Sequence, residues 1–262
     1  MDKLVQHAVD GPVARLTLDS PHNRNALSTT LVNQLHQGLR DAVANPAVRV
    51  VALGHTGNTF CAGVDLSQAS AGDPFEMAAE RAHELAGLLR AIVESPMPVI
   101  ATVNGHVRAG GLGLVGACDI AVAGPRSSFA LTEARIGVAP AIISLTLLPK
   151  MSARAAARYY LTGETFDAAT AAEIGLITMS ADTDEGVDAA VASLVADVQR
   201  ASPQGLAASK ALTTAALLAG FDCDAERLAA ESARLFVSDE AREGMLAFLQ
   251  KRPPNWASSS DG

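Results

Sequence analysis

The apolar positions along the chain follow a strand spacing in some stretches and a helix spacing in others. Short apolar or alternating runs bounded by turn residues predict strands at 13–19, 48–54, 99–103, 119–123 and 129–132. Longer stretches with apolar residues near helical spacing, or with capping residues at their starts, predict helices at 28–44, 74–94, 152–161, 167–174, 184–200, 203–219, 224–237 and 239–250. Strands early and helices late favour one β-rich core with a helical annex over two independent domains.

The stretch 98–119 changes character halfway. After the apolar run at 99–103 and a turn at 104–105, nearly every residue from Ala109 to Gly116 is glycine or a small aliphatic residue. We expect Gly110 and its neighbours to open a short helix that ends at Ala117, whose first N–H groups have no partner inside the helix. Free N–H groups directed at one point are suited to holding negative charge on an oxygen.

A second interpretation of this stretch comes from its glycine spacing. Gly111, Gly113 and Gly116 match the G-x-G-x-x-G pattern of a dinucleotide site, and Glu133 follows about twenty residues later. The pattern requires a crossover helix of about ten residues or more before the next strand, whereas the next strand-like run begins at Asp119. The spacing therefore disfavours an NAD-dependent oxidoreductase, which stays a remote alternative.

Composition narrows the class of protein. The 262 residues suffice for one large domain with a sizeable core, and no apolar run approaches the length of a membrane span. The N-terminus lacks the pattern of a signal peptide, and the three cysteines have no metal or disulfide spacing, which predicts a cytoplasmic protein without a metal site. The net charge of −8 argues against nucleic acid or a membrane surface as a partner.

Two loops and one acid are the candidate chemistry. The segment 60–65 and the segment 109–111 can each present a backbone N–H; singly each is an ordinary turn, but together they favour a paired site. Glu133, at the end of a predicted strand, is either an exposed residue paired with Arg135 or a carboxyl in a dry pocket with its pKa raised towards neutrality. Cys61 has no evident base nearby, so a nucleophilic role is disfavoured.

Several motifs spread over nearly the whole chain support a further inference. They are RNAL at 24–27, FCAGVDL at 60–66, PVIATVNG at 98–105 with the glycine stretch and ACDI, FALTEARIGVAPA at 129–141, GL at 175–176, PQGLAASK at 203–210 and EGMLAFLQKRPPNW at 243–256. In these motifs the chain resembles the crotonase, or enoyl-CoA hydratase/isomerase, superfamily. The resemblance implies an α/β fold, a crotonase-like spiral of ββα repeats with a C-terminal helical region.

The resemblance also implies an organisation and a substrate. Residues 1–200 would form the spiral core with an oxyanion hole and a catalytic glutamate. Residues 201–262 would form a helical region for trimerisation and for covering coenzyme A. It implies a homotrimer or a dimer of trimers, an acyl-CoA thioester as substrate, and no cofactor other than the coenzyme A that is part of that substrate.

By position, the resemblance assigns roles to individual residues. The N–H groups of Val64 and Gly110 would hold the thioester oxygen, and Glu133 would be the catalytic acid and base. The remaining assigned residues would contact the CoA ester: Arg24, Ala26, Ala62, Gly63, Asp65, Leu66, Gly111, Gly113, Thr132, Lys210 and Lys251. For the two lysines, a solvated helix face is an equal alternative.

One departure from the family pattern affects the predicted reaction. Hydratases of the family carry a second glutamate where this chain has Gly113. Enolate chemistry on an acyl-CoA is therefore predicted more firmly than hydration. An enoyl-CoA hydratase-like lyase is the first hypothesis, a double-bond isomerase or another crotonase-type enzyme the second, and a non-catalytic CoA-ester binder a remote one. His106 and Arg108 are candidates for placing a water or a polar acyl group, with a turn residue and a surface cation as the alternatives.

Overall fold

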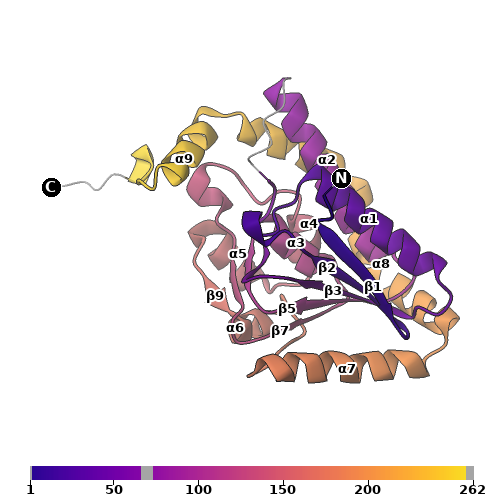
Figure 1. Ribbon diagram of the computed structural model, residues 1–262. Coiled ribbons are helices and arrows are strands. Elements are labelled where there is room, and N and C mark those ends of the chain that lie inside the picture. The colour runs from indigo at the N-terminus through magenta and orange to yellow at the C-terminus, as the bar shows by residue number, and fades with distance from the viewer. Residues whose placement is uncertain (1, 66–72, 258–262) are drawn as a thin grey trace.

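The computed structural model describes residues 2–65 and 73–257, which fold around two sheets (Figure 1). The larger sheet has the strand order β1-β2-β3-β5-β7-β10 and the smaller the order β4-β6-β8-β9. The strands of the larger sheet are β1 (Val5–Asp10), β2 (Val13–Leu18), β3 (Val50–His55), β5 (Val99–Val103), β7 (Ile120–Ala123) and β10 (Met179–Ser180). Those of the smaller sheet are β4 (Thr59–Cys61), β6 (His106–Arg108), β8 (Ser128–Ala130) and β9 (Phe166–Asp167).

The helices follow the strands in a regular order in the first half of the chain. They are α1 (Thr29–Ala44), α2 (Pro74–Glu94), α3 (Gly110–Ala117), α4 (Ser144–Leu147), α5 (Ala153–Thr162), α6 (Ala168–Glu173), α7 (Asp184–Arg200), α8 (Pro203–Phe236) and α9 (Asp239–Leu249). Three short 3₁₀ helices complete the described elements: η1 (Pro21–Asn23), η2 (Glu133–Ile136) and η3 (Asn255–Ala257).

The chain winds as a spiral of ββα turns. In one turn β3 lies in the larger sheet, β4 in the smaller sheet, and α2 follows; β5, β6 and α3 repeat the order. Successive turns stack with parallel strand pairing, because β3 pairs with β5, β5 with β7, β4 with β6, and β6 with β8. The α/β fold class with a spiral of ββα repeats and a C-terminal helical region is thus confirmed.

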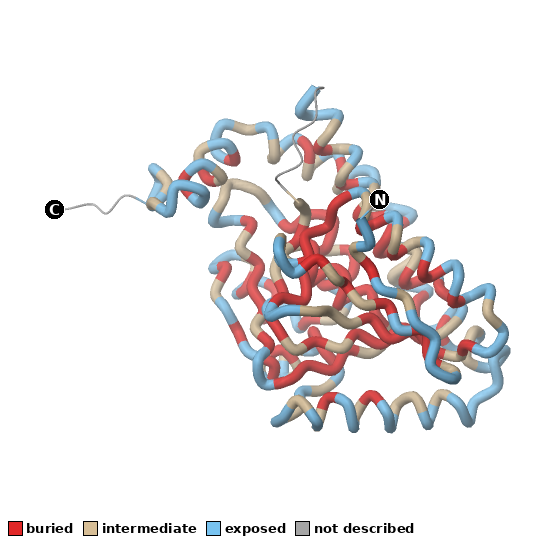
Figure 2. The backbone as a smooth tube through the Cα atoms, in the orientation of Figure 1, coloured by how far each residue is buried: buried red, intermediate tan, exposed pale blue. Residues whose placement is uncertain are grey.

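Alternating side chains send the two faces of the larger sheet into two different cores. Along β2, Ala14, Leu16 and Leu18 face a core shared with α1, α2 and α3. Val13 and Val50 face the other side, where Val187 and Val191 of α7 cover them. Figure 1 shows α7 lying alone across that outer face, and Figure 2 shows the buried residues concentrated between the sheets and the inner helices.

Local signals fixed most element ends. The Ser28 side chain accepts a hydrogen bond from the N–H of Leu31 at 3.2 Å and caps α1, and Asp73 caps α2 in the same way. The predicted helices at 74–94 and 184–200 and the strand at 99–103 are confirmed. Strands β1, β4, β6, β9 and β10 were not predicted, since β4, β6, β9 and β10 have three residues or fewer and β1 shows no clear alternation.

The two helices predicted at 203–219 and 224–237 are wrong, because they form one helix, α8, of 34 residues. The sequence predicts Asp224 as a capping residue at the start of a second helix. Tertiary packing overrides that local preference: Phe221 is 2 % exposed, and Asp222 pairs with Arg90 of α2 at 2.6 Å.

The expected boundary between the spiral core and the C-terminal region falls at the end of α7. Among the described helices, none is both long and apolar enough to cross a membrane.

Candidate active site

Three parallel strands of the smaller sheet end at the same edge and direct the predicted site segments there. The register pairs Cys61 of β4 with Val107 of β6, and Arg108 of β6 with Ala130 of β8. Carboxyl ends of neighbouring parallel strands lie at one edge of a sheet. Val64, Gly110 and Glu133 each follow their strand by two or three residues, so the topology gathers these three predicted residues at that edge.

The loop after β4 is held by the segment 24–27. The N–H of Ala62 donates to the carbonyl of Arg24 at 3.1 Å. The N–H of Leu27 donates to the carbonyl of Gly63 at 2.7 Å, and Asp65 donates back to Leu27 at 3.1 Å. The two segments therefore pair like strands, and Leu27 forms a parallel bridge with Val64. Backbone hydrogen bonds thus fix residues far apart in the sequence next to each other.

A buried asparagine, Asn25, locks this pairing and was not predicted. Its side-chain oxygen accepts from the N–H of Ser20 at 2.7 Å. Its amide nitrogen donates to the carbonyls of Thr56 at 3.1 Å and Thr59 at 2.8 Å. Its φ of 53° is one that asparagine tolerates better than most residues. The signal that could have found it is an asparagine that directly precedes a buried apolar pair in the RNAL motif.

The close approach of the β4 loop to α3 depends on Gly63. Its φ is +93°, and a Cβ atom there would lie 2.7 Å from the Cβ of Ala109 and 3.1 Å from the nitrogen of Gly110. A residue with a side chain does not adopt that φ readily, and its Cβ atom would not fit in that space. Glycine at this position brings the backbone that precedes Val64 against the N-terminus of α3.

Ala109 makes the sharp turn from β6 into α3. Its φ of 47° and ψ of −123° are strained for a residue with a Cβ, and such outliers concentrate at functional sites. In the hydrogen bonds among residues 2–65 and 73–257, the N–H groups of Val64 and Gly110 donate to no acceptor. The positive end of the α3 dipole lies at the second of these groups. Two adjoining loops thus each offer a free backbone donor.

The rest of α3, which includes the predicted contact residues Gly111 and Gly113, is packed closely against protein. Every residue of α3 is buried. A Cβ on Gly111 would lie 2.6 Å from the carbonyl oxygen of Cys61, and one on Gly113 would lie 2.5 Å from Cγ2 of Ile143 and 3.2 Å from Leu89. The absence of a side chain at these two positions therefore allows α3 to pack closely against the β4 loop and Ile143. The space in front of Gly113, where a second glutamate was considered, is filled by Ile143.

Glu133 begins η2 directly after β8, in an apolar environment. Its side chain is 9 % exposed, and its Oε2 has no hydrogen-bond partner in the part of the chain that the structure describes. Burial raises the pKa of this carboxyl from 4.5 to about 7. The alternative of a surface pair with Arg135 is wrong, because Arg135 donates to the carbonyl of Thr162 at 2.9 Å. A carboxyl with this pKa can both accept and deliver a proton near neutral pH.

His106 and Arg108 are directed at Ser128 rather than at the site. The His106 Nδ1 lies 2.8 Å from the Ser128 hydroxyl. The Arg108 guanidinium donates to the Ser128 carbonyl at 2.7 Å and to its hydroxyl at 3.0 Å. Both side chains tie β6 to β8, and this structural role replaces the considered role in placing a water.

Lys210 is the clearest departure from the predicted contacts. Its Nζ lies 2.7 Å from Asp119 Oδ2 and donates to the carbonyls of Ile92 at 2.9 Å and Met97 at 3.1 Å. An ammonium group has three N–H donors, so none is left for a CoA phosphate. We therefore remove Lys210 from the candidate site and assign it a role in joining α8 to the core.

The other predicted binding residues divide by exposure. Arg24 is exposed, has a left-handed φ of 59°, and forms no ion pair with any described residue. Ala26 is buried beside it, and Thr132 is half-buried at the start of η2. Lys251 is exposed after α9, in a region that projects away from the sheets (Figure 1). Leu66 lies outside the described residues.

Two chemistries find no support at this edge of the sheet. Burial raises the pKa of the Cys61 thiol to about 12, which keeps it protonated and unreactive at neutral pH. No group of three or more His, Cys, Asp or Glu side chains within 2–65 and 73–257 is arranged to hold a metal ion.

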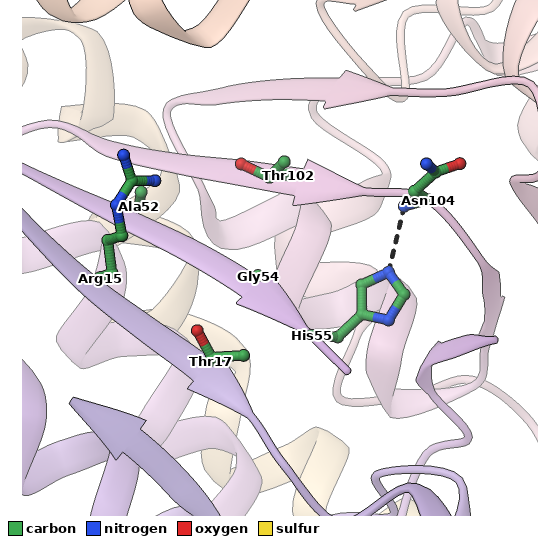
Figure 3. Close-up of a pocket in the computed structure, with 7 residues that line it drawn as sticks. All are labelled: Arg15, Thr17, Ala52, Gly54, His55, Thr102 and Asn104. Carbon is green, nitrogen blue, oxygen red and sulfur yellow. Dashed lines mark hydrogen bonds between the residues drawn. The ribbon is translucent and has the colours of Figure 1, made fainter. Parts of the chain in front are cut away.

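A separate hollow of about 190 Å³ lies on the outer face of the larger sheet (Figure 3). In it the N–H of Asn104 donates to Nε2 of His55 at 3.1 Å. The hollow is lined by Arg15, Thr17, Ala52, Gly54, His55, Thr102 and Asn104. These side chains point to the face that α7 partly covers, opposite the face that packs on α3. The hollow is therefore not part of the candidate active site.

Comparison with known proteins gives the class of this fold and site. A family model described as enoyl-CoA hydratase/isomerase matches residues 9–259. The crystal structure of an enoyl-CoA hydratase from Mycobacterium avium superposes with a TM-score of 0.91 at 75 % identity, over 98 % of this chain and all of that one. The spiral of ββα turns, the shared edge of β4, β6 and β8, and the buried Glu133 together define a protein of the crotonase class. The chain belongs to the enoyl-CoA hydratase/isomerase family of enzymes.

Relatives with different reactions lie within the same range of similarity. An enoyl-CoA hydratase of Alternaria alternata is 31 % identical over 89 % of this chain and 77 % of that protein. A peroxisomal Δ(3,5)-Δ(2,4)-dienoyl-CoA isomerase of Arabidopsis thaliana is 24 % identical over 97 % of this chain and 96 % of that protein. Family membership therefore leaves the choice between hydration and isomerisation to the site itself.

Proposed function

We propose that this protein is an enoyl-CoA hydratase-like lyase that adds water to a 2-enoyl-CoA thioester. The observation that carries the proposal is the shared edge of β4, β6 and β8. There the free N–H groups of Val64 and Gly110 adjoin, and the buried Glu133 follows the neighbouring strand with a pKa of about 7. Two donors and one proton-transfer group are what an enolate mechanism on a thioester needs.

In the proposed reaction a single glutamate moves the proton in both steps. The oxygen of water forms a bond to C3, the C2–C3 π electrons move onto the thioester oxygen, and the Glu133 carboxylate takes a proton from the water. The N–H groups of Val64 and Gly110 stabilise the resulting enolate oxygen, an effect of about 3–4 kcal/mol for a single donor of this kind. Glu133 then delivers its proton to C2 as the thioester carbonyl reforms.

The CoA part of the substrate would lie along the paired segments beside this edge. Arg24 is an exposed cation suited to a phosphate, and the backbone of 24–26 and 62–65 would line the approach to Val64. Lys251, from the same chain or a neighbouring copy, would add a second cation.

A homotrimer, or a pair of trimers, is part of the proposal. Exposed apolar side chains on the C-terminal helices and on α5 support it, since isolated chains rarely expose so many. They are Leu161, Leu212, Leu246, Phe248 and Leu249.

Isomerisation of a 3-enoyl-CoA is the second candidate, and one observation favours it. Because Ile143 fills the space in front of Gly113, no second carboxyl is placed at that position among the residues that the structure describes. A single glutamate suffices to carry a proton between two carbon atoms of an enolate.

Steady-state assays separate these reactions. We expect loss of the enoyl absorbance of crotonyl-CoA, with a kcat/KM that rises with pH through about 7 because Glu133 must be ionised to accept the proton of water. We expect Glu133→Ala to lower kcat at least a hundredfold while CoA-ester affinity is kept. Turnover of 3-hexenoyl-CoA without hydration of crotonyl-CoA would favour the isomerase. Full activity of Glu133→Ala would exclude both.

A further inference from the structure

Two unsatisfied oxygen atoms lie on elements that pack against each other beside the site. Within residues 2–65 and 73–257, three buried side-chain atoms lack a hydrogen-bond partner: His7 Nε2, Glu133 Oε2 and Tyr160 Oη. Tyr160 belongs to α5, whose end is tied to η2 by the bond from Arg135 to the carbonyl of Thr162. Buried polar atoms in folded proteins are nearly always bonded, so each exception requires an explanation.

The Tyr160 hydroxyl and the Glu133 carboxyl are close enough to interact electrostatically. Burial, and after it the charge of Glu133, raise the pKa of Tyr160 above its ordinary value. The two groups nevertheless form no hydrogen bond with each other. Both oxygens are thus buried and unbonded on two elements that pack against each other, and one small polar group bound between them would satisfy both.

In the proposed hydration, the attacking water needs a hydrogen-bonding partner that α3 does not supply. Holding a water for attack on C3 takes two hydrogen-bonding partners, so that both of its protons are directed away from the carbon. Glu133 is one partner. The space in front of Gly113 is filled by Ile143 and offers no second one. Tyr160 approaches from a different side, on α5.

We propose that the Tyr160 hydroxyl is a positioning residue that holds the attacking water against Glu133. This inference rests on the proposed hydratase function. The water donates one proton to the Glu133 carboxylate and its second hydrogen bond to Tyr160 Oη, which leaves a lone pair directed at C3. In the step, the O–C3 bond forms and the proton passes to Glu133, while Tyr160 keeps its own proton throughout. The reverse reaction uses the same contact to the departing hydroxyl.

The test is Tyr160→Phe, which removes one oxygen and keeps the ring. Two reactions are measured: hydration of crotonyl-CoA, and exchange of the C2 proton of butyryl-CoA in deuterium oxide. The exchange needs Glu133 and the two N–H groups but no positioned water. We expect the kcat of hydration to fall about 10- to 100-fold with KM within twofold, and exchange to stay within threefold.

Tyr159→Phe is the matched control, because it removes the same atom from the next residue of α5. The Tyr159 ring packs on Phe166 with centroids 4.1 Å apart, and neither reaction should change. Unchanged hydration in Tyr160→Phe would overturn the proposal. So would a parallel loss of hydration and exchange, or a change in KM alone, since these indicate a structural or substrate-binding role. Absence of Glu133-dependent exchange in the unmodified enzyme would instead overturn the proposed function.

Discussion

At the scale of single residues, Glu133 combines a chemical role with a cost to the fold. Its carboxyl is buried among apolar groups without a partner for Oε2, and burial raises its pKa to about 7. In the unfolded chain the same group titrates near 4.5. Between these two values the folded state binds more protons than the unfolded state, so the free energy of unfolding falls as pH rises.

The first prediction concerns this pH dependence. Above pH 7 the ionised Glu133 should lower the free energy of unfolding by about 3 kcal/mol relative to pH 4.5. Glutamine cannot ionise, so Glu133→Gln should lose that part of the pH dependence. The difference in the free energy of unfolding between Glu133→Gln and the unmodified protein should therefore favour the variant more at pH 8 than at pH 5. Urea unfolding at both pH values measures the difference.

A control for this prediction is Glu84→Gln. Glu84 is half-buried on α2, accepts a hydrogen bond from Thr29 at 3.0 Å and lies outside the site, so the same change of carboxyl to amide there should not reproduce the effect of Glu133→Gln. Parallel stability curves for Glu133→Gln and the unmodified protein between pH 5 and 8 would contradict the raised pKa.

At the scale of elements, α3 shows what determines the shape of the site. The sequence correctly predicts its bounds and its free N-terminus, because runs of glycine and small residues are visible without a structure. It does not predict which groups its glycines face. That depends on Ile143, thirty residues later, and on Leu89 of α2.

The second prediction tests that packing by a double-mutant cycle. Gly113→Ala should destabilise the protein by about 1–3 kcal/mol, since its Cβ would lie 2.5 Å from Ile143 Cγ2. Ile143→Ala creates space, so the double variant should be more stable than the sum of the two single effects by at least 0.5 kcal/mol, measured by urea unfolding. Gly87→Ala in α2, where no atom lies within 4 Å of the new Cβ, is the control and should not destabilise. Strict additivity would show that Ile143 does not limit the site.

Element boundaries show the limits of local signals. Ser28, Asp167 and Pro74 mark helix starts that the sequence predicts within a residue, because capping is a local interaction. The continuous α8 is not predicted, because its central turn is held by Phe221 and Asp222 through contacts with other elements. Residues in short strands such as β6 have too few positions to show a period.

At the scale of the whole molecule, the C-terminal half is joined to the spiral by a buried ion pair. Lys210 of α8 reaches Asp119 at the start of β7, and the same carboxylate accepts from the N–H of Val99 at 2.7 Å. The sequence motif around Lys210 predicts a residue that binds the CoA ester, whereas the structure directs its side chain into the protein, onto Asp119. Which way a side chain points depends on how α8 packs on α2, and no local pattern encodes that.

The third prediction separates the two roles considered for the lysines. Lys210→Met should lower the free energy of unfolding by about 3 kcal/mol, because it leaves the half-buried Asp119 without its cation. The KM for the CoA ester should not change in the fraction that folds. Lys251→Met should leave stability unchanged, since Lys251 is exposed. A raised KM with unaltered thermal stability in Lys210→Met would restore its role in CoA binding.

The glycine contacts of α3 also limit how this protein can diversify over generations. A single added carbon at Gly111, Gly113 or Gly116 meets another atom at 2.9 Å or less, so a larger residue there requires a compensating change in the group that it meets. At position 113 that group is the Ile143 side chain, which can itself be exchanged for a smaller one. A second acidic group at this edge would therefore need at least two coupled substitutions, one on α3 and one at position 143.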